Sequence, residues 1–442
     1  MSKTIIQGTV VTPPNLDSEE AVNEYKDTGA TFQSTFINVV NTIIGAGILS
    51  IPSSIHGTGL IGSLLLLVMA CLFSICGAFF LIVSAVYTKK DSYGDIGQTL
   101  YGTTVRNISI ITLILYEVGV STAYSVILFE QVLDLLSVWG GFNSATLWRN
   151  RWWITYVATL LFSVPLLCMK SLDSLRYTSF GAVLCIFLFV CISIYLGVTQ
   201  LVKEPLHYNL FPSDSSQTAV SMTIFSSALC FHTNIPKMVR ELKYPKATRF
   251  ATKVHKMFRI GTTAAISCTS LYYIVGAFAY FAFGNEIAGN LLTNFQHKGF
   301  WYLEIVKFAY ALVVIFSNPV IAFPSVYVID KVLFKDERNW RRRLAESLLW
   351  CTVIWFIATL VPQLDVVFSF TGATGGILLL YVLPSYFYIA IVKRVRKKAN
   401  SAALSLLGPS WLYWAAHCLI VATLIEGCIS IVTQIKKLTG SS

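Results

Sequence analysis

Long apolar segments recur along almost the whole chain and are separated by short polar connections. Eleven of these segments have about 18 residues or more, the length at which an apolar helix can cross the hydrocarbon core of a membrane. The pattern therefore predicts eleven membrane-spanning helices and no separate soluble domain. The predicted spans are residues 33–56, 60–86, 108–138, 152–169, 177–202, 217–238, 258–284, 301–329, 345–362, 365–391 and 411–435.

The first predicted span contains the sequence Gly45-Ala46-Gly47 near its centre, with polar Asn41 and Thr42 just before it. Glycine weakens a helix by about 1 kcal/mol relative to alanine. We therefore expect this helix to unwind at membrane depth, where irregular backbone is tolerated only beside protein or a cavity. A continuous helix that packs through its small residues is the alternative.

Composition and charge agree with a membrane location. The chain is 55% apolar and 12% charged, whereas soluble domains have about 25% charged residues. The net charge of +11 arises from basic residues in short loops, so we predict no nucleic-acid partner. A cytosolic N-terminus places 26 of the 33 Lys and Arg residues inside and 6 outside. This asymmetry predicts a cytosolic tail over residues 1–30 and an extracytosolic C-terminus.

The span count also allows an internal repeat. Spans 1–5 and 6–10 necessarily have opposite orientations, which permits an inverted repeat of residues 31–202 and 203–391. Residues 392–442 then supply a cytosolic linker and an eleventh helix. Such a repeat predicts a second interrupted helix at span 6.

Span 6 has the composition expected of an interrupted helix. Ser226, Ser227 and His232 lie where lipid favours apolar residues, and Pro236 disfavours helical geometry at Ile235. The alternative is a continuous helix whose polar side chains form hydrogen bonds inside the bundle.

Several stretches carry a resemblance to a known family. They are Asn41-Thr42-Ile43-Ile44-Gly45-Ala46-Gly47-Ile48-Leu49-Ser50-Ile51-Pro52, Ser171-Leu172-Asp173-Ser174-Leu175-Arg176-Tyr177-Thr178-Ser179, Cys230-Phe231-His232, Asn318-Pro319 and Phe323-Pro324. The chain resembles the amino acid/auxin permease family, especially its sodium-coupled neutral amino-acid transporters and fungal vacuolar amino-acid transporters. The resemblance implies the LeuT-type fold of five plus five helices and transport of amino acids.

A free amino acid brings a carboxylate and an ammonium group, and each needs a partner at membrane depth. The backbone N–H groups freed at residues 45–47 are expected to bind the carboxylate. Carbonyl groups near Thr42 and at Ser226 and Ser227 are expected to accept from the ammonium group. His232 is a candidate for a pH-sensitive contact or for a hydrogen-bonding strut.

Other polar residues are candidates for ion coupling. In the sodium-coupled members that the chain resembles, an Asn and a hydroxyl at the positions of Asn41 and Ser317 take part in a sodium site, which the Ile44 carbonyl would complete. Interhelical hydrogen bonding is the alternative for both side chains. Glu117 lies inside span 3, where a carboxylate carries a coupled proton, pairs with a cationic substrate, or stays protonated within the bundle.

The remaining charged residues in the spans are expected to have local roles. Glu304 and Lys307 are three residues apart and predict an ion pair. Glu130 and Asp134 lie near the outer end of span 3, where we expect them to be solvated, and Glu426 is expected to be structural.

Two basic stretches, residues 237–259 and 393–398, offer binding to anionic lipid headgroups, although membrane orientation alone explains them. His417 is expected to be structural.

The leading hypothesis is a monomeric secondary transporter that moves amino acids by alternating access. The chain has no Walker A sequence, so the hypothesis requires coupling to a Na⁺ or H⁺ gradient and no other cofactor. An amino-acid sensor that signals to a cytosolic partner is the alternative. We predict that the chain is not an enzyme, because no nucleophile, base or metal cluster is evident. Both the plasma membrane and the vacuole or lysosome remain open as locations.

Overall fold

Helices make up nearly all of the regular structure. The computed structural model describes residues 29–169, 176–203, 208–212, 214, 216–244, 250–296, 300–334, 339–397, 404 and 407–439. Within these residues the β-structure is limited to an isolated bridge between Ala30 and Leu242. Most of the predicted N-terminal tail and the start of the 171–179 stretch lie outside the described residues. The predicted all-α class is confirmed.

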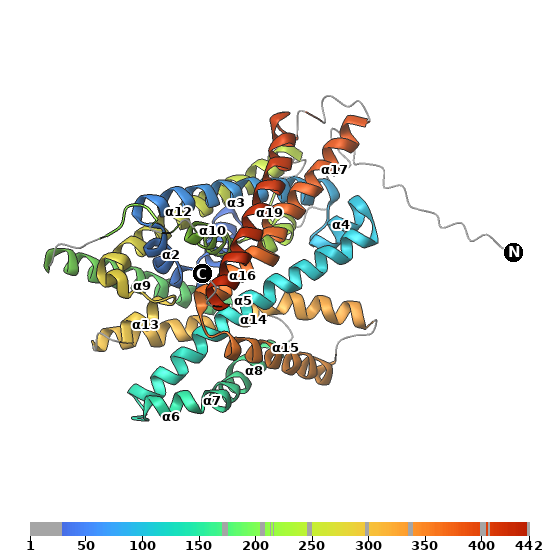
Figure 1. Cartoon of the computed structure of the whole chain (residues 1–442). Helices are drawn as coiled ribbons and strands as arrows, with labels where there is room; N and C mark the ends of the chain where they lie inside the picture. Colours follow the sequence, from blue (N-terminus) through green and yellow to red (C-terminus); the bar gives the residue numbers. More distant parts are fainter. Residues whose placement is uncertain are drawn as a thin grey trace.

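The α-helices and the short 3₁₀ and π segments follow one another along the chain (Figure 1). The α-helices are α1 (Phe32–Ile43), α2 (Ile51–Thr58), α3 (Leu60–Thr88), α4 (Tyr93–Tyr101), α5 (Thr103–Val138), α6 (Ser144–Arg149), α7 (Arg151–Ala158), α8 (Val164–Leu167), α9 (Arg176–Lys203), α10 (Ser216–Ala228), α11 (Ile235–Glu241), α12 (Phe250–Phe283), α13 (Leu291–Gln296), α14 (Trp301–Leu333), α15 (Trp340–Leu360), α16 (Leu364–Thr371), α17 (Leu383–Lys397) and α19 (Trp411–Thr439). The 3₁₀ segments are η2 (Ala46–Leu49), η5 (His232–Asn234) and η6 (Gly284–Glu286), and the π segments are η3 (Thr159–Ser163), η7 (Gly372–Gly376) and η8 (Leu378–Val382).

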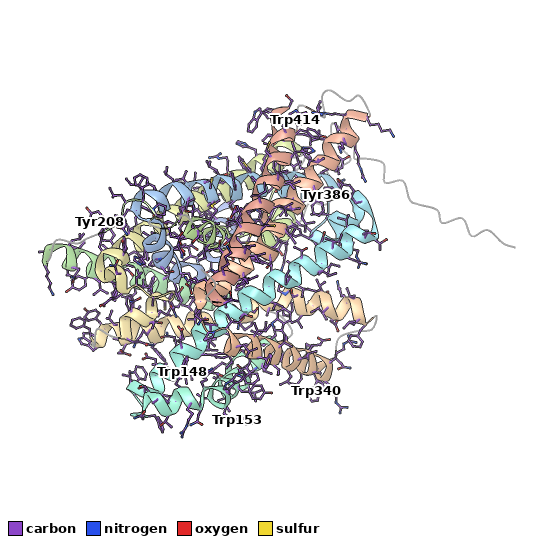
Figure 2. All side chains as sticks on the ribbon, viewed as in Figure 1. Trp148, Trp153, Tyr208, Trp340, Tyr386 and Trp414 are labelled. Carbon is purple, nitrogen blue, oxygen red and sulfur yellow. The ribbon has the colours of Figure 1, made fainter. Side chains whose placement is uncertain are left out.

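Eight helices of the described part are long and apolar enough to cross a membrane. They are Leu60–Thr88, Thr103–Val138, Leu184–Lys203, Phe250–Glu286, Trp301–Leu333, Trp340–Leu360, Leu364–Lys397 and Trp411–Thr439. Each overlaps a predicted span, and a shorter apolar helix, Arg151–Leu167, lies where the fourth span is expected. Large aromatic side chains such as Trp153 and Trp414 point outward from the bundle (Figure 2), as suits a surface in contact with lipid.

Two of the remaining segments contain short α-helices joined by irregular backbone. In the first, α1 ends at Ile43, and the chain passes through η2 before α2 begins at Ile51. In the second, α10 ends at Ala228, and η5 precedes α11. A further irregular segment, which the sequence analysis did not anticipate, is the pair of π segments η7 and η8 between α16 and α17.

The helices pack in two neighbouring groups. In one, α12 contacts α2, α3 and α9, and α10 contacts α2 and α3. In the other, α5 contacts α14 and α15, and Figure 1 shows α5 running across the molecule beside α14. Helix α1 reaches α12, and α16 joins α5 to α10, so the irregular segments lie between the two groups.

A buried ion pair cluster fixes one end of α5 to α14. The Lys307 side chain is fully buried, and its Nζ lies 2.7 Å from Glu304 Oε1 and 2.6 Å from Asp134 Oδ2. The predicted Glu304–Lys307 pair is therefore confirmed. The expectation that Asp134 and Glu130 are solvated is wrong, because Asp134 pairs with this lysine and Glu130 accepts a hydrogen bond from Asn290 at the start of α13.

Candidate substrate site

A cavity of about 130 Å³ lies where α1 ends, enclosed by α5, α10, α14 and α16. Its lining includes the predicted site residues Asn41, Thr42, Gly45, Ala46, Gly47, Glu117, Ser227 and Ser317. The interruption of α1 thus borders an internal space, and polar side chains from α5 and α14 face the same space.

Two of the backbone N–H groups beyond α1 already have partners. The Gly45 N–H donates to the Ile43 carbonyl over 2.8 Å, and the Ala46 N–H donates to the hydroxyl of Tyr124 on α5 over 3.2 Å. A Cβ at residue 45 would lie 2.2 Å from the Tyr124 Oη, so only glycine allows this approach. The expected donors to a carboxylate are present, but a tyrosine oxygen occupies one of them.

The freed carbonyl groups beyond α1 are also bound by tyrosines. The Tyr272 hydroxyl of α12 donates to the Ile43 carbonyl over 2.5 Å and lies 3.1 Å from the Ala228 carbonyl. The Tyr310 hydroxyl of α14 donates to the Gly45 carbonyl over 2.9 Å. Tyr272 therefore contacts both interrupted segments, because Ile43 ends α1 and Ala228 ends α10.

At the end of α10, the Ser227 carbonyl accepts from the Tyr116 hydroxyl over 3.3 Å. Ser227 lines the cavity, whereas Ser226 does not and is almost fully buried. The side-chain hydroxyls of both serines lack a hydrogen-bond partner among the described residues. The cavity therefore meets α10 through Ser227, whereas Ser226 lies outside its lining and the contact expected of the Ser226 carbonyl stays a prediction.

His232 also lies outside the cavity lining. Its ring is fully buried, and Nε2 lies 3.1 Å from the Ser74 carbonyl of α3. The neighbouring Ser74 hydroxyl donates to the Leu229 carbonyl over 3.2 Å. This geometry ties η5 to α3, as the hydrogen-bonding strut expected as one of two roles would, and a contact of His232 with substrate stays a prediction.

The ion-coupling candidates divide in the same way. Asn41 and Ser317 line the cavity, whereas Ile44 is buried outside the lining. Glu117 lines the cavity, is 3% exposed, and has Ser325 of α14 beside it. Its Oε2 is buried and has no hydrogen-bond partner within the described part of the chain.

The sequence analysis missed the tyrosines of the site. Tyr124 is seven residues after Glu117 on α5, and Tyr310 is seven residues before Ser317 on α14. Seven residues are about two helical turns, so each pair shares a helix face. The seven-residue spacing could therefore have pointed to Tyr124 and Tyr310 from the sequence. The same search can be made around any candidate residue on a long helix.

An all-helical membrane fold around a small internal cavity with polar groups in its wall is an arrangement that integral membrane transport proteins have. The family described as transmembrane amino acid transporter protein matches residues 28–430, and the chain belongs to this family. The resemblance stated from the sequence is therefore confirmed.

Similar proteins are known from plants, animals and fungi. The chain is 25% identical over 435 residues to the amino acid transporter AVT6E of Arabidopsis thaliana, covering 94% of this chain and 85% of the relative. It is 24% identical to the sodium-coupled neutral amino acid symporter 2 of Danio rerio (85% and 78% covered) and 27% identical to the vacuolar amino acid transporter 5 of Schizosaccharomyces pombe (85% and 88% covered). These relatives are named as transporters, which supports the prediction of a non-enzyme.

Solved transporter structures share the fold. The manganese transporter of Eremococcus coleocola aligns with a TM-score of 0.59 at 14% identity, covering 93% of this chain and 88% of that one. The transporter MhsT in complex with L-phenylalanine aligns with a TM-score of 0.55 at 13% identity, covering 90% and 98%. These likenesses show a LeuT-like helical arrangement.

Proposed function

We propose that this protein is a secondary active transporter that moves amino acids across a membrane by alternating access, coupled to a Na⁺ or H⁺ gradient. The observation that carries the proposal is the polar cavity at the interruption of α1, where backbone N–H and carbonyl groups are held by tyrosine hydroxyls. A tyrosine hydroxyl both donates and accepts, so it is able to release a backbone group to a ligand and then bind that ligand.

In the proposed complex, the substrate carboxylate takes the place of the Tyr124 oxygen at the Ala46 N–H, and the Tyr124 hydroxyl turns to donate to the carboxylate. The ammonium group contacts Thr42, Asn41 and Ser227, which line the same cavity. This arrangement provides a partner for each charge of a zwitterion, as burial of either charge requires.

Ion coupling is assigned to two alternative groups at this cavity, one of which includes the neighbouring Ile44 outside its lining. A sodium ion would use Asn41, Ser317 and the Ile44 carbonyl, which are oxygen ligands suited to a hard cation. A coupled proton would use Glu117, whose carboxyl has an oxygen without a partner in the described structure.

The proposal includes the eleven-span plan. In this plan the chain from α1 to α2 and the chain from α10 to α11 are interrupted spans, residues 31–202 and 203–391 are inverted repeats, and residues 392–442 add the last helix. The N-terminus is cytosolic, because most basic residues then lie inside.

With this orientation the described state opens inward. Asn41, Thr42 and Asn234 are partly exposed and belong to the inner halves of their segments. On the outer side, α13 is inserted between helices, and its Leu292 and Phe295 are fully buried. The outer route to the cavity is therefore covered while the inner route is more accessible.

The test is flux of labelled amino acids into proteoliposomes that contain the purified protein, with a sodium gradient, a proton gradient or neither. We expect concentrative uptake with one of the two gradients. Binding of an amino acid without any flux would favour the sensor instead, and flux that ignores both gradients would remove the ion-coupling assignment.

A further inference from the structure

A second hollow lies far along the chain from the substrate site, between the C-terminal end of α4, α17 and the first turns of α19. We call it the basic groove, and Tyr101, Tyr386, Lys393, Arg394, His417 and Ile420 are among its lining residues. Its volume is about 380 Å³, and Figure 2 labels one of its lining residues, Tyr386, and Trp414 of the neighbouring α19.

The polar part of the basic groove is cationic, and no Asp or Glu is among the described residues that line it. Arg394 is oriented by the end of α4, because Nη1 donates to the Thr99 carbonyl over 3.3 Å and Nη2 donates to the Leu100 carbonyl. A guanidinium has five N–H donors, so others remain for a ligand. Lys393 is exposed and forms no ion pair among the described residues.

His417 adds a third group with hydrogen-bonding capacity. Its Nδ1 lies 2.8 Å from the Tyr413 carbonyl one turn earlier on α19. Because Nδ1–H donates to that carbonyl, Nε2 is left for another partner. The three side chains come from two helices and converge on the same groove.

The basic groove becomes apolar with depth. On α17, Ile389 precedes Lys393 by four residues, and on α19, Ile420 follows His417 by three residues. At 1.5 Å per residue these separations are about 6 Å and about 4.5 Å along the helices. Both helices therefore place charge toward the end that joins α17 to α19 and apolar side chains further into the bundle.

Exposed tryptophans mark the level of the charged part. Trp411 and Trp414 precede His417 on α19 and are 61% and 67% exposed. Tryptophan is enriched at the membrane–water interface. Tyr101 and Tyr386 stack with ring centroids 4.2 Å apart and form an aromatic wall next to the cationic groups. The groove thus extends from the headgroup level into the hydrocarbon region.

We propose that the basic groove binds an anionic phospholipid. The headgroup phosphate is held by Lys393 and Arg394, the His417 Nε2 accepts from an N–H or O–H group of the headgroup, and the acyl chains follow Tyr386 and Ile420 into the bilayer. Basic pockets between membrane helices on the cytosolic side bind such headgroups. A soluble phosphoester shares the headgroup chemistry, but it has no use for the apolar part of the groove. The bound lipid would join α4, α17 and α19 at their inner ends.

The proposal is tested by native mass spectrometry on the delipidated full-length protein in detergent. The protein is titrated with dioctanoyl phosphatidylserine, with dioctanoyl phosphatidylcholine and with glycerol 3-phosphate. We expect tightest binding of the anionic lipid. The Lys393→Gln variant should weaken that binding about fivefold, which corresponds to the ~1 kcal/mol typical of one basic residue near an anionic lipid surface.

Lys397→Gln is the matched control, because it removes the same charge from an exposed position one turn further along α17, outside the lining. This control should leave the affinity within twofold of the wild type. An equal loss in both variants, or equal binding of phosphatidylcholine, would overturn the proposal. Competition by glycerol 3-phosphate at the same concentration as the lipid would also overturn it and assign the groove to a soluble phosphoester. Gel filtration of Lys393→Gln verifies that the fold is intact.

Discussion

Replacing Tyr124 by phenylalanine removes one oxygen atom from the wall of the substrate cavity. That oxygen lies 3.2 Å from the Ala46 nitrogen and accepts its hydrogen bond. The ring of Tyr124 is 5% exposed and keeps its packing in the variant. The substitution therefore tests whether this hydroxyl and the Ala46 N–H mark the position of the substrate carboxylate.

Two states determine the expected magnitude. In the empty protein, the variant loses a neutral hydrogen bond that contributes about 0.5–1.5 kcal/mol. In the proposed complex, it loses a hydrogen bond to a carboxylate that contributes about 1.5–3 kcal/mol. The difference, about 1–1.5 kcal/mol, weakens the binding of substrate by roughly 5- to 13-fold.

The assay is the initial rate of labelled amino-acid uptake into proteoliposomes as a function of substrate concentration. Tyr310→Phe is the control, because it also removes a tyrosine hydroxyl bound to the irregular backbone, here from the Gly45 carbonyl, but Tyr310 does not line the cavity. We expect KM to rise for Tyr124→Phe and to change little for Tyr310→Phe. An unchanged KM for Tyr124→Phe, or equal changes in both variants, would refute the carboxylate position.

Three further substitutions test other parts of the structure. Gly47→Ala places a methyl group 2.7 Å from the nearest atom of α10, so transport should fall and the free energy of unfolding should decrease by about 1–3 kcal/mol. In the control Gly57→Ala the nearest contact of the new methyl group is 3.7 Å, so transport and stability should be retained. Lys307→Met leaves Asp134 without its cation and should lower the free energy of unfolding by about 3–5 kcal/mol. Adding Asp134→Asn should restore part of this free energy, and no recovery would contradict the pairing. If uptake is driven by sodium, Ser317→Ala should raise the sodium concentration for half-maximal uptake about tenfold, which corresponds to a loss of ~1.4 kcal/mol of sodium-binding free energy. An unchanged sodium dependence would exclude the serine as a ligand.

The sequence located the long helices well because membrane spans depend mainly on local composition. Eight predicted spans coincide with apolar helices of membrane-spanning length. Their ends differ by several residues, as for α5, which begins at Thr103 rather than at residue 108. The polar first turn of this helix lies outside the apolar run, so hydropathy alone does not include it.

Partners of individual residues were harder to predict, because they depend on helices that are distant in sequence. The pairing of Glu304 with Lys307 follows from their spacing on one helix and was predicted. The contact of Lys307 with Asp134 joins residues 173 positions apart and was missed. The same reason explains why two roles stayed open for His232, since nothing in the local sequence reveals the Ser74 carbonyl next to its ring.

The tyrosine contacts also meet a physical requirement, the pairing of buried backbone groups, which the sequence around Gly45 reveals only in part. Interrupting α1 frees backbone groups, and each buried group left unpaired costs about 1–3 kcal/mol. A transporter of the proposed kind must return with an empty cavity, so a ligand is not always present to pair those groups. Tyr124 and Tyr310 pair them from the long helices α5 and α14 when the cavity is empty. A Ser or Thr at the same positions is too short to reach, whereas the length of a tyrosine places its hydroxyl at the interrupted backbone without unwinding the helix that carries it.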